Sequence, residues 1–126
     1  MSGRPAQLVP VSLIVDQAAI NRYAAITGDY NPIHVEPDFA AKTEMKGVIA
    51  HGTLCMNLIW QALERSLGRE AVCGIDLDIR FRRPARVGDR IEAGGQWNDE
   101  SNAYAVWIRN GEGTEIISGD AILKAP

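Results

Sequence analysis

The sequence predicts an α+β fold in which a curved antiparallel sheet wraps around one long central helix. Residues 51–67 have helical length, and their apolar side chains cover most of the helix circumference, so the rest of the domain must enclose this helix. Residues 75–82 then alternate between apolar and charged side chains, which is typical of a strand with one buried face. Three more strand-like segments follow, and antiparallel strands after one apolar helix favour a sheet that curves around it.

The first quarter of the chain is predicted as a strand followed by a helix. Residues 7–15 have the composition of a strand, and a proline in their middle indicates an edge strand or a bend. Asp16 is suited to cap a helix over residues 17–27, and Gly28 is suited to end it. Residues 36–42 are predicted as a short helix with a proline in its first turn.

The second half of the chain is predicted to supply the remaining strands. These strands cover residues 90–97, 103–109 and 114–124. The polar segments between them, residues 98–102 and 110–113, are predicted as hairpin loops.

Composition limits the classes of function. Residues 1–126 have the length of one domain, and the net charge of −3 gives no support for nucleic-acid binding. No segment approaches the roughly 20 apolar residues of a membrane span, and the N-terminus lacks the pattern of a signal peptide. Cys55 and Cys73 fit no metal-binding spacing, and their apolar neighbours predict buried thiols in a reducing compartment. We expect a soluble cytoplasmic protein without contacts to nucleic acid or membrane.

Residues 29–34 are the strongest candidate for a catalytic segment. They are predicted to be non-helical, because the Asn-Pro pair within them disfavours a new helix. The segment carries Asp29, Asn31 and His34, and a carboxylate and an imidazole close to one small molecule can exchange its protons. The alternatives are that Asp29 only bonds its own backbone, that His34 is a core histidine and that Asn31 is structural.

A His51-Gly52 pair opens the long helix. Backbone N–H groups in the first turn of a helix are suited to bind negative charge, and glycine lets a substrate approach the backbone closely. His51 is suited either to orient a ligand or to make a structural hydrogen bond, and we leave it out of the catalytic set. Asp29, His34 and His51 have no sequence spacing that is typical of a metal site, so no metal is expected.

A basic cluster stands out in this acidic chain. Its members are Arg80, Arg82, Arg83, Arg86 and Arg90. Such a cluster is suited to hold a phosphorylated ligand, and the alternative is a solvated strand face.

Three segments resemble the MaoC-like, (R)-specific enoyl-CoA hydratases, also called type 2 enoyl-CoA hydratases. Residues 23–34, YAAITGDYNPIH, resemble the signature of that family, with a Gly-Asp-x-Asn-Pro-x-His core. Residues 47–54, GVIAHGTL, are similar to the start of its central helix, and residues 81–89, FRRPARVGD, to its strand-to-strand turn. The resemblance covers essentially the whole domain and implies the hotdog fold.

The resemblance implies hydration of a trans-2-enoyl thioester to an (R)-3-hydroxyacyl thioester, or the reverse reaction. It implies that Asp29 and His34 hold one water between them, that Asn31 supports the loop, and that the backbone N–H of Gly52 binds the thioester oxygen. Which of Asp29 and His34 is the base and which the acid stays open at this point. No cofactor is implied, since hydration needs only a polarised thioester and a positioned water.

The resemblance also implies partners. The substrate is an acyl-CoA or acyl-carrier-protein thioester, and Arg80, Arg82 and Arg83 are the candidates for contacts to its phosphates. A homodimer is expected, because hotdog domains usually pair through their sheets. Aromatic residues in the last strands favour a partner subunit over the outer sheet face; these are Trp97, Tyr104 and Trp107.

Two other functions remain open at this stage. A hotdog acyl-CoA thioesterase usually needs a carboxylate near the start of the central helix, and the first one here is Glu64, far along it. A non-catalytic acyl-thioester-binding hotdog subunit would be expected to lose Asp29 or His34, and this chain keeps both.

Overall fold

The computed structural model describes residues 4–124 and shows one five-stranded antiparallel sheet. Its strands lie in the order β1-β3-β4-β5-β2. The bounds are β1 Val11–Ile14, β2 Ile75–Phe81, β3 Arg90–Asn98, β4 Ala103–Asn110 and β5 Glu115–Leu123. The three strands predicted for the second half are therefore confirmed, and so is the strand that follows the long helix.

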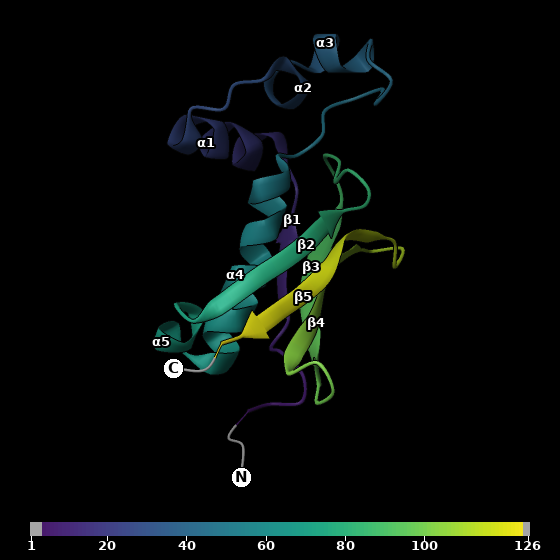
Figure 1. Cartoon of the computed structure of the whole chain (residues 1–126). Coiled ribbons are helices and arrows are strands. Elements are labelled where there is room, and N and C mark those ends of the chain that lie inside the picture. Colours follow the sequence, from purple (N-terminus) through teal and green to yellow (C-terminus); the bar gives the residue numbers. More distant parts are fainter. Residues whose placement is uncertain (1–3, 125–126) are drawn as a thin grey trace.

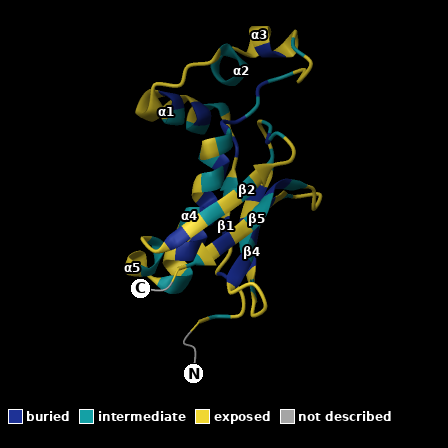
Figure 2. Ribbon diagram, viewed as in Figure 1, coloured by how far each residue is buried: buried dark blue, intermediate teal, exposed yellow. Residues whose placement is uncertain are grey.

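The central helix α4 (Gly52–Leu67) lies along one face of this sheet, where it packs against β1, β3 and β4 (Figure 1). Its buried residues share one face of the helix, with the spacing of three and four that this requires. They are Cys55, Leu58, Ile59, Ala62 and Leu63. The opposite side carries exposed Thr53, Asn57 and Gln61, so the helix is enclosed on one side only in the single chain. Figure 2 shows the buried residues where α4 meets the sheet.

Three helices lie together at one end of α4, away from most of the sheet (Figure 1). They are α1 (Gln17–Thr27), α2 (Pro32–Val35) and α3 (Pro37–Ala41). Helix α1 has its predicted bounds, and α3 lies within the predicted short helix. A further short helix, α5 (Arg69–Val72), follows α4 and was not predicted. Among residues 4–124, no helix has the length and apolar character needed to cross a membrane.

The predicted N-terminal strand is shorter than expected. Regular pairing is confined to β1, which lies at an edge of the sheet beside β3. Upstream of Pro10, pairing to β3 is reduced to a bridge between Gln7 and Gln96 and two flanking hydrogen bonds. The Leu8 N–H donates to the Gly95 carbonyl, and the Trp97 N–H donates to the Ala6 carbonyl. Pro10 has no N–H to donate, and the expected edge position and interruption are both confirmed.

The expectation that three aromatic residues lie on the outer sheet face, under a partner subunit, is wrong for two of them. Tyr104 is fully buried in the core, its hydroxyl donates to the Pro5 carbonyl over 2.6 Å, and its ring packs edge-on against Trp97. Trp97 pairs directly with Tyr104 across β3 and β4, and directly paired residues share a face. Trp107 alone is on the outer face, where the Arg109 guanidinium lies 4.2 Å from its ring.

Candidate functional site

The end of α1 presents Asp29. The Asp16 carboxylate caps the start of this helix by accepting from the Ala19 N–H over 2.7 Å, and Gly28 ends it with a φ of 75°. This left-handed conformation suits glycine, and the Gly28 N–H closes the last turn on the Ala24 carbonyl. The chain therefore turns sharply at Gly28, and Asp29 lies outside α1.

Asn31 begins a helix, and the prediction that residues 29–34 are non-helical is wrong in this respect. Its side-chain oxygen accepts from the Ile33 N–H over 3.2 Å, which makes Asn31 the N-cap of α2. Pro32 is the first residue of α2, a position where the missing N–H costs nothing and the fixed φ is already helical. His34 consequently lies on a helical turn. The Asn31 N–H also donates to the Asp29 carboxylate over 3.2 Å.

One hydrogen bond determines the tautomer of His34. Its Nδ1 lies 2.7 Å from the carbonyl oxygen of Ile49, and a carbonyl oxygen can only accept. Nδ1 therefore carries the hydrogen in the neutral ring, which leaves a lone pair on Nε2. The His34 backbone is held as well, because its carbonyl accepts from the Gln17 side chain over 2.9 Å.

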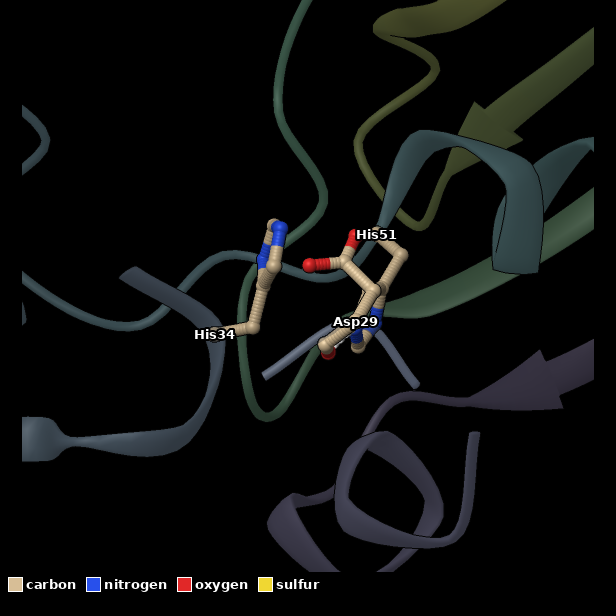
Figure 3. Close-up of side chains that lie close together, drawn as sticks. All are labelled: Asp29, His34 and His51. Atoms are coloured by element: carbon tan, nitrogen blue, oxygen red, sulfur yellow. Dashed lines mark hydrogen bonds between the residues drawn. The ribbon is translucent and has the colours of Figure 1, made fainter. Parts of the chain in front are cut away.

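Asp29, His34 and His51 lie together (Figure 3). One ligand atom from each residue, a carboxylate oxygen or a ring nitrogen, lies within 4.8 Å of those of the other two. The Asp29 carboxylate points toward the His34 imidazole (Figure 3). Two hydrogen bonds of ordinary length that meet at one water oxygen span roughly 4.6 Å, which is comparable with this separation.

The same three residues are a geometric candidate for a metal site, but the rings are poorly arranged for one. The imidazoles of His34 and His51 are stacked, with centroids 4.0 Å apart and planes 28° apart. A metal ion lies close to the plane of each imidazole that binds it, and two stacked rings do not direct their lone pairs at one point. The arrangement suits water and proton transfer better than a shared ion.

A cavity of about 280 Å³ lies beside this cluster and is mostly apolar. His34 lines it, as does Gly52, the first residue of α4. The N–H of Gly52 belongs to the first turn, where backbone donors have no partner within the helix. Cys55 and Ile116 also line the cavity, and both are buried. Glu64 is exposed, far along α4, and lies 3.5 Å from Arg69 in an ion pair.

Phe81 packs directly over Gly52 and was not singled out from the sequence. A Cβ placed on Gly52 would lie 2.7 Å from Cε1 of Phe81, closer than such atoms approach in proteins. The ring lines the cavity but remains 58% exposed. Its position in the alternating pattern of β2 was the available signal, because Phe81 continues the apolar face of that strand beyond Ile79.

The predicted basic cluster is divided by the fold. Arg82 and Arg83 line the cavity, and the Arg82 Nε donates to the Ser118 hydroxyl over 3.0 Å. Arg80 does not line the cavity. Arg86 donates to the Met45 carbonyl, and Arg90 donates to the Ser12 hydroxyl over 3.2 Å.

The two cysteines differ, and the expectation that both are buried is wrong for Cys73. Cys73 is exposed because it lies in the turn after α5, whereas Cys55 is 2% exposed. Burial raises the pKa of the Cys55 thiol to about 11, partly offset by a backbone hydrogen bond. Cys55 is therefore a neutral apolar lining group at ordinary pH, which makes it a poor nucleophile.

A family model described as the MaoC like domain matches residues 3–118. This chain belongs to that family. Among curated relatives, the 3-hydroxybutyryl-CoA dehydratase of Methylorubrum extorquens is 33% identical over 82% of this chain and 69% of its own length. The (R)-specific enoyl-CoA hydratase of Aeromonas caviae is 29% identical over 86% of this chain and 85% of its own.

Solved structures confirm the fold. The R-hydratase PhaJ1 from Pseudomonas aeruginosa, in its unliganded form, superimposes with a TM-score of 0.79 and 26% identity over 99% of this chain and 83% of that one. With the antiparallel sheet curved around α4, this similarity confirms the expected α+β hotdog fold. The MaoC-like assignment made from residues 23–34, 47–54 and 81–89 is likewise confirmed.

Proposed function

We propose that this MaoC-like chain is a hydro-lyase that interconverts a trans-2-enoyl-CoA and the (R)-3-hydroxyacyl-CoA by adding or removing water. One observation carries the proposal. Asp29 and His34 place a carboxylate oxygen and a ring nitrogen within 4.8 Å of each other, and His34 lines a cavity that the first residue of α4 also lines. The names of the curated relatives in Methylorubrum and Aeromonas support the same reaction class.

His34 is the base for hydration in this proposal. Its Nδ1–H is committed to Ile49, so its Nε2 lone pair is free to accept a proton from the water. The Asp29 carboxylate accepts a hydrogen bond from the second O–H of that water, which stays on the oxygen, and so orients the water. The water oxygen forms a bond to C3, and the C2–C3 π electrons move toward the thioester carbonyl. The proton taken from the water is returned to C2, which leaves both residues in their starting protonation states.

Gly52 stabilises the charge that develops on the thioester oxygen. Its backbone N–H lies at the positive end of a 16-residue helix and next to the cavity, and one such donor contributes roughly two to three decades in rate in other enzymes. Asn31 supports the pair indirectly, because its backbone N–H holds the Asp29 carboxylate and its side chain caps α2.

The phosphates of the substrate contact Arg82 and Arg83 in this proposal. Both line the cavity, both are exposed enough to meet a ligand, and guanidinium groups bind phosphate with two donors at once. Arg80, the third arginine expected here, lies on the outer face of β2 and is excluded from the proposed contacts. An acyl-carrier-protein substrate would present a phosphopantetheine phosphate to the same two residues.

A homodimer formed through β2 completes the proposed assembly. β2 ends the sheet, so its second edge has no strand partner within residues 4–124. An antiparallel pair of β2 strands related by a twofold axis at Ile79 would place Asp78 opposite Arg80 of the other copy. Registers centred on Asp78 or Arg80 place two like charges opposite each other, and registers centred half a residue from Ile79 pair residues of opposite faces.

Two coarser assignments complete the proposal. The chain is one domain over residues 1–126, since the family match extends over residues 3–118 and one sheet and one central helix account for the core. We assign it to the cytoplasm, which agrees with two cysteines that form no disulfide.

The experiment is hydration of crotonyl-CoA and of a longer trans-2-enoyl-CoA, followed by the ultraviolet loss of the conjugated thioester. Asp29→Asn and His34→Gln should each lower kcat by about 10³-fold or more with unchanged circular dichroism. Asp38→Asn is the matched control, because Asp38 is an exposed acid on α3 outside the cavity. Wild-type activity that survives both site substitutions would place the chemistry elsewhere. A folded wild type without activity on either thioester would favour a non-catalytic binding subunit.

A further inference from the structure

His51 is a buried polar residue to which the proposed chemistry gives no task. Within residues 4–124 it is the only buried polar or charged residue, at 2% exposed, and its Nδ1 has no hydrogen-bond partner among the described protein groups. Buried polar atoms without a partner are rare in proteins because they are costly, so a residue that leaves one calls for a physical reason.

The contacts of His51 reach both members of the proposed pair. Its Nε2 lies 3.0 Å from the backbone carbonyl oxygen of Asp29. Its ring face stacks on the ring of His34, and the ring of Tyr23 packs against it edge-on at 4.9 Å. Tyr23 is held in turn by its hydroxyl, which donates to Thr53 over 2.6 Å. His51 is also the residue directly before Gly52, so it contacts the Asp29 backbone and the His34 ring and adjoins the start of α4.

These contacts determine the state of the His51 ring. The Asp29 carbonyl can only accept, so Nε2 carries the hydrogen. A second hydrogen on Nδ1 would be a buried donor without an acceptor, on a cationic ring stacked against His34. The neutral ring of His51 thus carries its hydrogen on Nε2, whereas the neutral ring of His34 carries its hydrogen on Nδ1. The two histidines of this chain have opposite tautomers.

We propose that His51 is a positioning residue for the reaction. Its hydrogen bond holds the backbone of Asp29, its ring face holds the orientation of the His34 imidazole, and its place in the chain links both to the Gly52 N–H. The distance between carboxylate and imidazole, on which a single bridging water depends, is thus set by a ring that touches neither water nor substrate. This inference rests on the hydratase function proposed above.

The kinetic test compares His51→Leu with His51→Gln. Leucine removes the donor and the flat ring, whereas the glutamine amide can still donate to the Asp29 carbonyl. We expect His51→Leu to lower kcat by about 10²-fold, with KM within about threefold of wild type, as for misplaced catalytic groups. The kcat of His51→Gln should be at least about tenfold higher than that of His51→Leu. Ile59→Ala, a buried change about two turns further along α4, should lower the melting temperature without a comparable loss of kcat.

A spectroscopic arm separates failure of this inference from failure of the proposed function. The chain has only two histidines, so a long-range ¹H–¹⁵N spectrum of the imidazoles contains two rings. We expect opposite tautomers in the wild type and loss of the fixed Nδ1–H form of His34 in folded His51→Leu. Equal kcat in His51→Leu and Ile59→Ala, no rescue by glutamine, or an unchanged His34 signal in His51→Leu would overturn the positioning role. A wild type without hydratase activity but with the expected spectra would overturn only the proposed function.

Discussion

Two carbonyl oxygens determine what the histidines of this site can do. The Ile49 carbonyl accepts a hydrogen bond from His34 Nδ1–H, and the Asp29 carbonyl accepts one from His51 Nε2–H. His34 is consequently left with a basic nitrogen at the cavity, and His51 is left with its lone pair in the interior. The backbone acceptor of each ring therefore leaves His34 able to accept a proton at the cavity, whereas His51 can only hold its neighbours in place.

The buried thiol of Cys55 makes stability depend on alkaline pH. The thiol ionises near pH 9 in the unfolded chain and near pH 11 in the folded one, so the stability that it contributes is present below pH 9 and is lost as the pH rises toward 11. At pH 10.5 this loss amounts to about 2 kcal/mol. Urea unfolding at pH 8 and pH 10.5 should show a smaller loss in Cys55→Ala than in the wild type. Cys73→Ala, which alters an exposed thiol, should keep the wild-type dependence.

At the scale of elements, the first turn of α4 depends on the end of β2. The Phe81 ring occupies the space that a side chain at position 52 would need. We expect Gly52→Ala to destabilise the protein by about 1–3 kcal/mol, as overpacking does, and to lower kcat/KM by about tenfold or more. In a Phe81→Ala background, Gly52→Ala should no longer destabilise the protein, because the space for the new methyl group is open. Turnover of the double variant should stay low, because that methyl group still blocks approach to the N–H of residue 52. Recovery of both quantities would mean that Gly52 serves packing only.

The turn after β2 contributes the proposed phosphate contacts. Arg82→Ala and Arg83→Ala should each raise KM for crotonyl-CoA by about three- to tenfold, the range of an exposed ionic contact, with kcat little changed. The same variants should leave KM for crotonyl-pantetheine, which lacks phosphate, at its wild-type value. Arg65→Ala is the matched control, because Arg65 is exposed near the end of α4 and does not line the cavity. An equal effect on both thioesters would assign these arginines to structure and not to phosphate.

At the scale of the whole molecule, the alternating charges of β2 make a test of the dimer. Asp78→Arg or Arg80→Asp alone would place like charges opposite each other in the proposed register and should shift the chain toward monomer in sedimentation velocity. The double exchange restores opposite charges and should restore the dimer. A dimer that is indifferent to both single exchanges, or a wild-type monomer, would contradict the pairing at Ile79.

The elements that sequence patterns predicted correctly are those whose ends depend on local chemistry. α1 begins after Asp16 and ends at Gly28 because one side chain caps it and one glycine takes a positive φ. The strands after α4 follow from alternation and polar hairpin loops. Helix α2 was missed because Asn31-Pro32 ends a helix in one context and begins one in another, and only the fold distinguishes these contexts.

Only part of the site was predictable, because some of its contacts join residues that are far apart in the sequence. Asp29 and His34 are five residues apart, so one motif shows both. The contacts of His51 to Asp29, and of Phe81 to Gly52, join residues more than twenty positions apart. Nothing in a local pattern indicates such contacts. Tyr104 was placed on the wrong face because composition shows an aromatic residue, whereas strand register decides which face it takes.

In the proposed reaction, one water held between Asp29 and His34 supplies both the hydroxyl and the hydrogen that the product gains. The most direct measurement is hydration of crotonyl-CoA in deuterium oxide, followed by the configuration at C3 and at the deuterated C2. Because the water and the proton-transfer groups lie on one side of the substrate in this account, we expect the (R)-alcohol with deuterium on the same face as the new hydroxyl. Addition to opposite faces, or an (S)-alcohol, would contradict the account.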